Sequence, residues 1–352
     1  MRRAAKFLLK ILGAMIVVLI VAGVIYEQLG RRWDDRRHRQ VGRSVDIGGR
    51  SLNIHCSGDG SPTVVLENSV GYRWTPIQRE VAKFTQACWY DQAGYGWSDS
   101  GPKPRTSGAV ASDLHALLRA AAVPPPYVLV GASGDGFPVR VFAARHPNEV
   151  AGIVLADATH EDQYGREPRS SQGWANRLPA PVQAALLTVV PVAGEIGLFR
   201  LLLRATRPAD TDQPPEGMTA DEAQYLSFVS RLPRSFVTEA DVGRNWQASA
   251  EEARNAGTLG DVPLIVLTGG KFVTPRNPAY VSQARAFHQL WVHELQLKLA
   301  RLSSRGRQII IDNSGHGIQF EAPGVLITAI REIVGESRRD SNDREALDSS
   351  AK

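Results

Sequence analysis

Residues 127–136 read YVLVGASGDG, an apolar run that ends in small residues around one serine, Ser133. The next stretch, residues 139–146, has the pattern of a helix. A strand, a tight turn and a helix form the setting in which a serine hydroxyl is exposed at a sheet edge, near the positive end of the helix. Glycines permit the strained backbone of such a turn. We therefore predict that Ser133 is a nucleophile, the alternative being an ordinary Gly-Ser turn.

The charge of the chain is concentrated at its beginning. The formal net charge is +5 over 352 residues, of which 43% are hydrophobic. Residues 1–40 hold nine basic and three acidic side chains, a net charge of +6, so the remainder sums to −1. A basic surface that would attract nucleic acid is therefore not expected, and we predict no nucleic-acid partner.

An apolar segment near the start predicts a membrane anchor. Residues 11–26 contain no charged side chain, and the run extends back to residue 7 if Lys10 snorkels toward the interface. A span of about 20 residues suits one transmembrane helix. A cleaved signal peptide is the alternative, but no small-residue cleavage site precedes Glu27. We predict an uncleaved single-pass anchor through residues 7–26, and basic residues on both sides leave its orientation open.

The two cysteines bear on the compartment. Cys56 ends one candidate strand and Cys88 lies near the end of another. If these strands are neighbours, a disulfide is geometrically feasible and favours an extracytoplasmic catalytic domain. Two buried free thiols are the alternative. Two lone cysteines do not make a zinc site, and no metal is predicted.

Strand-like and helix-like stretches alternate along most of the chain. This alternation predicts parallel strands with helices on both faces of a sheet. It is interrupted over residues 158–260, where Ala- and Leu-rich stretches predict a helical cap. The charged tail from Glu336 is predicted to be disordered. The predicted strands are 40–46, 51–56, 63–66, 86–90, 127–130, 152–157, 262–268 and 308–312. The main predicted helices are 74–84, 112–118, 139–146, 182–190, 195–205, 239–255, 280–302 and 322–334.

Four motifs in chain order resemble the α/β-hydrolase superfamily over about residues 45–335. They are the strand PTVVLEN at 62–68, the loop YDQAGYGWS at 90–98, the elbow GASGDG at 131–136 and the block SGHGIQFEAP at 314–323. The resemblance implies a mostly parallel eight-stranded α/β-hydrolase sheet with helices on both faces, to which the residue patterns above add a helical cap inserted after strand 6 and an N-terminal transmembrane helix. The implied divisions are an anchor and basic flank at 1–40, a hydrolase core at 41–157 and 261–335, a cap at 158–260 and a tail at 336–352.

The same resemblance implies roles for individual residues. Ser133 corresponds to the nucleophile and His316 to the general base, which a serine hydroxyl needs before it can attack. The oxyanion would be held by backbone amides of Gly134 and of Ser69 or Asn68. This chemistry needs no cofactor, and none is predicted.

Two positions depart from the family pattern. Phe272 stands where many members place the catalytic acid after the seventh strand. We predict that Asp157, at the end of the sixth strand, is the acid instead, with Glu161, Asp162 or no acid as alternatives. Asp135 replaces the second glycine of G-x-S-x-G and would bring negative charge near the oxyanion.

The leading hypothesis is a serine hydrolase that cleaves a carboxylic ester or related acyl bond of an apolar small molecule. A binding protein with a weakened site at the membrane is the alternative, based on Phe272 and Asp135. Dehalogenase or epoxide hydrolase chemistry is disfavoured, because those relatives use a carboxylate where this chain has Ser133. The oligomeric state is not predicted.

Overall fold

The core is one sheet of eight strands in the order β1-β2-β4-β3-β5-β6-β7-β8. The computed structural model describes residues 2–163, 165–167, 179–205, 214, 217–230 and 232–350. β2 pairs antiparallel with β1 and β4, and the other neighbours pair in parallel. The predicted mostly parallel eight-stranded sheet is confirmed. The strands are β1 (Arg43–Asp46), β2 (Ser51–Ser57), β3 (Thr63–Glu67), β4 (Ala87–Tyr90), β5 (Tyr127–Ala132), β6 (Val150–Ala156), β7 (Leu264–Gly269) and β8 (Gly306–Ile311).

Helices cover both faces of the sheet. α3 (Ser107–Ala120) and α4 (Gly136–Arg145) bury residues such as Leu117 and Phe142 against one face. α2 (Thr75–Val81) and α13 (Pro323–Ser350) bury residues such as Ile77 and Ile330 against the other. Because both faces are covered, the parallel strands β3, β5 and β7 are buried along their whole length and read as continuous apolar runs.

The segment predicted as a cap is helical where the structure describes it. Its helices are α5 (Ala180–Glu195), α6 (Leu198–Ala205), α7 (Ala220–Ser230), α8 (Pro233–Arg244) and α9 (Trp246–Asn255). The sequence did not predict α7, and the predicted helix over 239–255 is broken at Asn245. α9 packs against α3 and α4, with Ala250 and Ala253 in the same apolar cluster. The last part of this segment therefore packs on two of the helices that cover the sheet.

The predicted helix over 280–302 contains an irregular turn. α10 (Val281–Leu290) passes into a π-helical turn at Trp291–Leu295 and then into α11 (Gln296–Ala300). Such turns shift the side chains that follow and are frequent at functional sites. Here the turn contains Trp291, which contacts the site described below.

The prediction of a disordered tail is wrong for most of its length, because α13 continues to Ser350. Arg305 pairs with Glu336 at 3.1 Å and with Asp340 at 2.6 Å. Arg338 donates hydrogen bonds to the carbonyl oxygens of Ser61 and Phe84. These side-chain contacts extend the helix beyond its apolar part.

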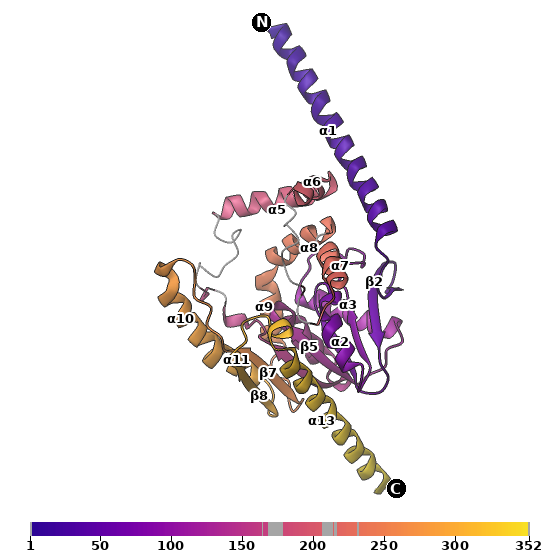
Figure 1. Cartoon of the computed structure of the whole chain (residues 1–352), viewed down its shortest axis with the longest axis vertical. Coiled ribbons are helices and arrows are strands. Elements are labelled where there is room, and N and C mark those ends of the chain that lie inside the picture. Colours follow the sequence, from indigo (N-terminus) through magenta and orange to yellow (C-terminus); the bar gives the residue numbers. More distant parts are fainter. Residues whose placement is uncertain are drawn as a thin grey trace.

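The first helix, α1 (Arg2–Arg37), projects away from the sheet, and the C-terminus lies at the opposite end of the molecule (Figure 1). Residues 6–34 are long and apolar enough to cross a membrane, and their most apolar stretch has a mean hydropathy of 2.8 and is not buried. The predicted anchor at 7–26 lies within this range.

Cys56 and Cys88 are joined by a disulfide. They lie directly opposite each other on the antiparallel strands β2 and β4. The free-thiol alternative is therefore not what the structure contains.

Candidate active site

Ser133 follows β5 directly and begins the turn into α4. Its φ is +54°, a left-handed value that is strained for a residue with a side chain. Gly131 and Gly136 allow this turn to be tight. A Cβ at Gly131 would lie 2.9 Å from the Asp135 carbonyl oxygen, and one at Gly136 would lie 2.6 Å from the Ala158 Cβ. The strained backbone thus places the Ser133 hydroxyl at the carboxyl edge of the parallel strands.

His316 lies in the loop between β8 and α12 (Ile318–Glu321). Its Nε2 is 2.9 Å from Ser133 Oγ, and its Nδ1 is 2.7 Å from Asp157 Oδ2. Because the Asp157 carboxylate accepts a hydrogen bond from Nδ1–H, Nε2 is the nitrogen that can accept the serine proton. The structure therefore brings these three predicted residues into one hydrogen-bonded chain, while their catalytic roles stay a prediction.

Asp157 follows β6 with a φ of +45° and is buried. Its Oδ1 accepts hydrogen bonds from the Gly269 amide at 2.9 Å and from Trp291 Nε1 at 2.8 Å. Its Oδ2 faces His316. Each carboxylate oxygen thus has its own partners, which fix the direction of the acid toward the imidazole.

The alternative acids are engaged elsewhere. Glu161 forms a bidentate pair with Arg140, at 2.5 and 3.0 Å. Asp162 pairs with Arg254 and Lys298. Phe272 packs beside His288, with the ring centroids 5.5 Å apart, and under the Arg285 guanidinium. The position after β7 therefore contributes no acid to His316.

The carboxylate changes the proton affinity of the imidazole. The hydrogen bond to Asp157 raises the pKa of His316, and burial opposes this effect only in part. A more basic imidazole is a better acceptor for the serine proton, and the imidazolium that forms is stabilised by the same carboxylate.

Asp135 lies in a network of polar side chains under the turn. Its Oδ1 accepts from Gln92 Nε2 at 2.9 Å, and its Oδ2 accepts from Asn68 Nδ2 at 3.1 Å. Gln92 Nε2 also donates to Glu67 at 2.7 Å, as does the Tyr90 hydroxyl. One amide group thus links the two carboxyl groups.

The two carboxyl groups favour their neutral forms. Burial raises the pKa of Glu67 to about 7. Burial, followed by the charge of Glu67, raises the pKa of Asp135 well above its ordinary value. A raised pKa favours the protonated, neutral form of a carboxyl, so burial and the charge of Glu67 both favour a neutral Asp135. The expected negative charge near the oxyanion is therefore reduced by the fold.

In the loop after β3, which is predicted to supply amides to the oxyanion, the Asn68 side chain accepts a backbone hydrogen bond. The Val70 amide donates to Asn68 Oδ1 at 3.2 Å, so this amide already has a partner. The amides of Ser69 and Asn68 stay the predicted donors from this loop, together with that of Gly134. Trp246 lies against Gly134, where an added Cβ would approach its ring to 2.9 Å.

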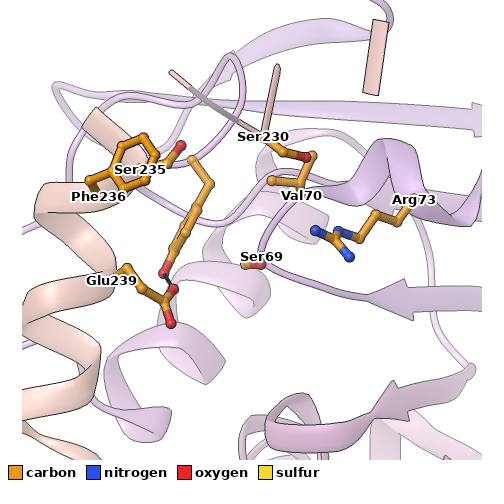
Figure 2. Close-up of a pocket in the computed structure, with 8 residues that line it drawn as sticks. Ser69, Val70, Arg73, Ser230, Ser235, Phe236 and Glu239 are labelled. Carbon is orange, nitrogen blue, oxygen red and sulfur yellow. Dashed lines mark hydrogen bonds between the residues drawn. The ribbon is translucent and has the colours of Figure 1, made fainter. Parts of the chain in front are cut away.

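A pocket of about 140 Å³ adjoins this loop at Ser69 (Figure 2). Val70 and Arg73 line it from one side, and Phe236 and Glu239 of α8 line it from the other. Glu239 accepts a hydrogen bond of 2.6 Å from the Tyr95 hydroxyl. The pocket therefore lies between the hydrolase core and the segment predicted as a cap, and its lining is part apolar and part polar.

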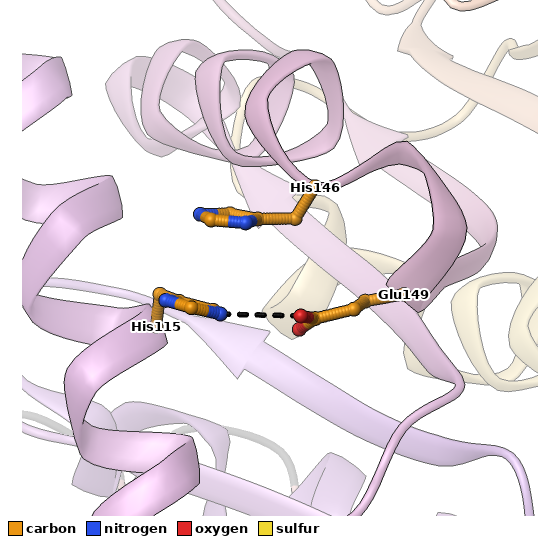
Figure 3. A group of neighbouring side chains, drawn as sticks. All are labelled: His115, His146 and Glu149. Atoms are coloured by element: carbon orange, nitrogen blue, oxygen red, sulfur yellow. Dashed lines mark hydrogen bonds and ion pairs between the residues drawn. The ribbon is translucent and has the colours of Figure 1, made fainter.

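One group of possible metal ligands lies elsewhere, formed by His115, His146 and Glu149 (Figure 3). The two imidazole rings are stacked, with centroids 3.7 Å apart and an interplanar angle of 11°. A cation is bound in the plane of an imidazole, so two stacked rings cannot both direct a nitrogen lone pair at one ion. Glu149 instead contacts His115 Nε2 at 3.2 Å. His115 lies on α3, and His146 and Glu149 follow the end of α4 that is farther from Ser133, so the group does not take part in the site.

Gln92, Trp291 and Glu67 belong to the site, but the sequence did not indicate their roles. Gln92 lies within a recognised motif, but nothing in the motif indicates that its amide links two carboxyl groups. Trp291 belongs to a stretch with ordinary helical periodicity, and no local signal indicates its bond to Asp157. Glu67 reads as the last residue of a strand.

Comparison with known proteins agrees with this architecture. The family model described as "alpha/beta hydrolase fold" matches residues 66–323. A protein of Hormonema carpetanum named "Probable transporter efuK" is 31% identical over 304 residues, 82% of this chain and 42% of that protein. The uncharacterized protein C23C11.06c of Schizosaccharomyces pombe is 46% identical over 252 residues, 71% of this chain and 42% of that protein. The chain thus spans less than half the length of these two relatives.

A solved structure shares the fold. A thermophilic esterase from Thermogutta terrifontis superposes with a TM-score of 0.55 at 17% identity, over 85% of this chain and 99% of the esterase. At that identity the likeness concerns the fold alone. The family match, which covers most of the chain, carries the conclusion: this chain belongs to the α/β-hydrolase family.

Proposed function

We propose that this protein is a membrane-anchored serine hydrolase that cleaves a carboxylic ester or a related acyl bond. The α/β-hydrolase fold supports hydrolase activity in general. The observation that carries the finer proposal is the chain of hydrogen bonds from Ser133 Oγ through His316 to Asp157. A serine, an imidazole and a carboxylate in this order supply the nucleophile, the base and the group that orients the base.

The geometry supports a two-step reaction. His316 Nε2 removes the proton from Ser133 as Oγ attacks the substrate carbonyl carbon, and a tetrahedral oxyanion forms. His316 then gives that proton to the leaving alcohol, and the bond between the acyl carbon and the leaving oxygen breaks. Water, deprotonated by the same nitrogen, releases the acid from the acyl-enzyme. Asp157 keeps the imidazole in the required tautomer throughout.

Backbone amides would stabilise the developing negative charge. Gly134 and Ser69 or Asn68 are the proposed donors, and losing one such donor typically costs about 2.7–4 kcal/mol in the transition state. The raised pKa of Asp135 is compatible with this role, because an ionised carboxylate beside the oxyanion would oppose its formation.

The pocket at Ser69 supports a small acyl or alcohol group with apolar character. A cavity of about 150 Å³ holds a molecule the size of benzene, and the pocket here has a volume of about 140 Å³. Val70, Tyr95 and Phe236 supply apolar surface, whereas Arg73 and Glu239 favour a substrate with one polar substituent.

The disulfide and the apolar helix α1 support a place for this domain outside the cytoplasm. A disulfide persists in an oxidising compartment and is rare in a reducing one. With Cys56 and Cys88 joined, we propose that the domain lies on the extracytoplasmic side of the membrane.

Ester hydrolysis by the purified full chain tests this function. p-Nitrophenyl esters of two to twelve acyl carbons are compared for wild type, Ser133→Ala and His316→Ala, with Ser304→Ala as the control at an exposed serine away from the site. We expect activity in wild type and Ser304→Ala, and a loss of at least about 10³-fold in the other two.

A fluorophosphonate separates the enzyme from a binding protein. Stoichiometric labelling of Ser133, located by peptide mass, supports the hydrolase. A wild-type chain that is folded but neither labelled nor active contradicts it and favours the binding protein instead.

A further inference from the structure

The helix that can cross the membrane is joined closely to the segment predicted as a cap. Gly23 and Gly30 of α1 face the turn between α5 and α6 and the start of α6. A Cβ at Gly23 would lie 2.4 Å from the Ile196 carbonyl oxygen, and one at Gly30 would lie 2.4 Å from Arg200 Nε. Because these two positions lack side chains, α1 meets the backbone of the α5–α6 hairpin, residues 180–205, at Gly23 and leaves room for the Arg200 side chain at Gly30.

Buried ion pairs fix how α6 faces α1. Arg200 Nε lies 2.8 Å from Glu27, and its Nη1 lies 2.5 Å from Asp34. All three side chains are at least nine-tenths buried. Arg31 pairs with Glu27 at 3.0 Å and reaches Glu195 of α5 at 3.4 Å. Charges buried in this way are costly to separate, so the contact defines one orientation of the hairpin.

The hairpin also presents an exposed apolar surface. Phe199 turns inward and stacks on Phe236 of α8, with ring centroids 5.1 Å apart. Six large aliphatic side chains among the described residues of this segment are between 43% and 60% exposed: Val182, Val189, Val192, Leu198, Leu201 and Leu202. Their spacing of three, four and seven residues puts them along one side of each helix. A soluble surface rarely exposes so many large aliphatic side chains together.

The position of this surface along α1 identifies what covers it. The uncharged run of α1 ends at Tyr26, and the turn at Ile196 and Gly197 contacts Gly23, within the last turn of that run. Figure 1 shows α5 and α6 as the part of the body nearest to the projecting half of α1. Trp33, which is 49% exposed, lies two turns farther on, at the depth where tryptophan is enriched in membrane interfaces.

We propose that the α5–α6 hairpin lies in the membrane interface, with its aliphatic side in the lipid. An amphipathic helix binds in this way when its apolar side reaches the acyl boundary. The hairpin packs on α8, which lines the pocket at Ser69, so the pocket would lie close to the bilayer and receive substrates that partition into lipid. The inference rests on α1 crossing the membrane, and its substrate consequence rests on the proposed function.

Site-directed fluorescence tests the depth of the hairpin without measuring activity. The only cysteines in the sequence, Cys56 and Cys88, are joined to each other, so an introduced cysteine can be labelled alone. The full chain is reconstituted in phosphatidylcholine vesicles with and without nitroxide-labelled lipid. An environment-sensitive fluorophore is placed at Val192→Cys, Leu201→Cys and Ile16→Cys. Val325→Cys, an exposed aliphatic position on α13, is the control.

We expect nitroxide lipid to quench the label at 16, 192 and 201 several-fold more than at 325, and aqueous iodide to show the reverse order. Quenching by lipid at 16 alone, with 192 and 201 as open to iodide as 325, would overturn the proposal. Protection of 192 and 201 from both quenchers would also overturn it and assign the surface to a second copy of the chain. No lipid quenching at 16 would remove the anchor on which the inference rests, whether or not the enzyme is active.

Discussion

Asp157 carries the clearest prediction for a single residue. Asp157→Asn keeps the size of the side chain but removes the charge that orients His316 and stabilises its protonated form. We expect kcat to fall by about 10⁴-fold, as in related triads. Asp162→Asn is the matched control, because Asp162 is close in sequence and pairs with Arg254 and Lys298 instead. Equal activity of the two variants would show that Asp157 is not the acid.

The pH dependence of kcat/KM follows from the pKa of His316. The hydrogen bond to Asp157 raises this pKa above the ordinary value of about 6.5. Only the neutral imidazole accepts the serine proton, so kcat/KM should decline as the pH falls through the raised pKa. A pH profile of ester hydrolysis, with the residual activity of Asp157→Asn alongside, measures this. The kcat/KM of Asp157→Asn should begin to decline at a lower pH than that of wild type. An acid limb at the same pH in both proteins would show that Asp157 does not raise the pKa of His316.

For Asp135, unlike Asp157, we predict that removing the carboxyl group has little effect on activity at neutral pH. Its pKa is raised well above the ordinary value, which favours the neutral carboxyl, so the neutral side chain in Asp135→Asn should change kcat/KM at pH 7 by less than about fivefold. At high pH the wild type should lose activity as Asp135 ionises, whereas the variant should not. A loss of 100-fold or more at pH 7 in a folded Asp135→Asn variant would mean that the carboxylate itself is needed.

Part of the site could be predicted from the sequence at this scale. Ser133 and His316 lie in local motifs whose glycines and order are visible in the chain, and Asp157 follows a visible strand. The raised pKa of Asp135 could not be predicted, because it depends on burial and on Glu67, which comes close only in the folded sheet.

At the scale of elements, the π-helical turn at Trp291–Leu295 has a functional consequence. Trp291→Phe keeps an aromatic ring but removes the N–H group that donates to Asp157 Oδ1. A hydrogen bond to a charged group contributes about 1.5–3 kcal/mol. Losing this hydrogen bond should lower kcat/KM by about tenfold and shift the pKa of His316 that the pH profile reports.

Trp97→Phe is the control for this change. It also removes one N–H hydrogen bond, which Trp97 donates to the Tyr225 hydroxyl away from His316. An equal effect of the two substitutions would indicate general destabilisation. Periodicity predicted a helix over 280–302, but the extra residue of the π-helical turn leaves no mark in that pattern.

The disulfide between β2 and β4 gives a prediction for stability. It closes a loop of 32 residues, and such a crosslink stabilises a fold by about 2–4 kcal/mol. The double variant Cys56→Ala/Cys88→Ala should lower the free energy of unfolding in urea by that amount. Reductant should lower the wild type to the same level and leave the variant unchanged. A wild type whose free energy of unfolding is the same with and without reductant would contradict the crosslink.

At the scale of the whole molecule, the sequence predicted the order of layers better than their contacts. Alternating strands and helices gave the parallel sheet, because that pattern is local. The packing of α1 on the α5–α6 hairpin depends on Arg200 meeting Glu27 and Asp34 from a distant part of the chain. The helical tail depends in the same way on Arg305.

The central claim is that Ser133 becomes acylated during turnover. Rapid mixing of the full chain with a p-nitrophenyl ester, followed by acid quenching and intact-protein mass measurement, tests it most directly. The account predicts a burst of about one equivalent of p-nitrophenol and a mass increase of one acyl group on the peptide that contains Ser133. Both should be absent in Ser133→Ala. Turnover without any covalent adduct, or an adduct on another residue, would contradict the account.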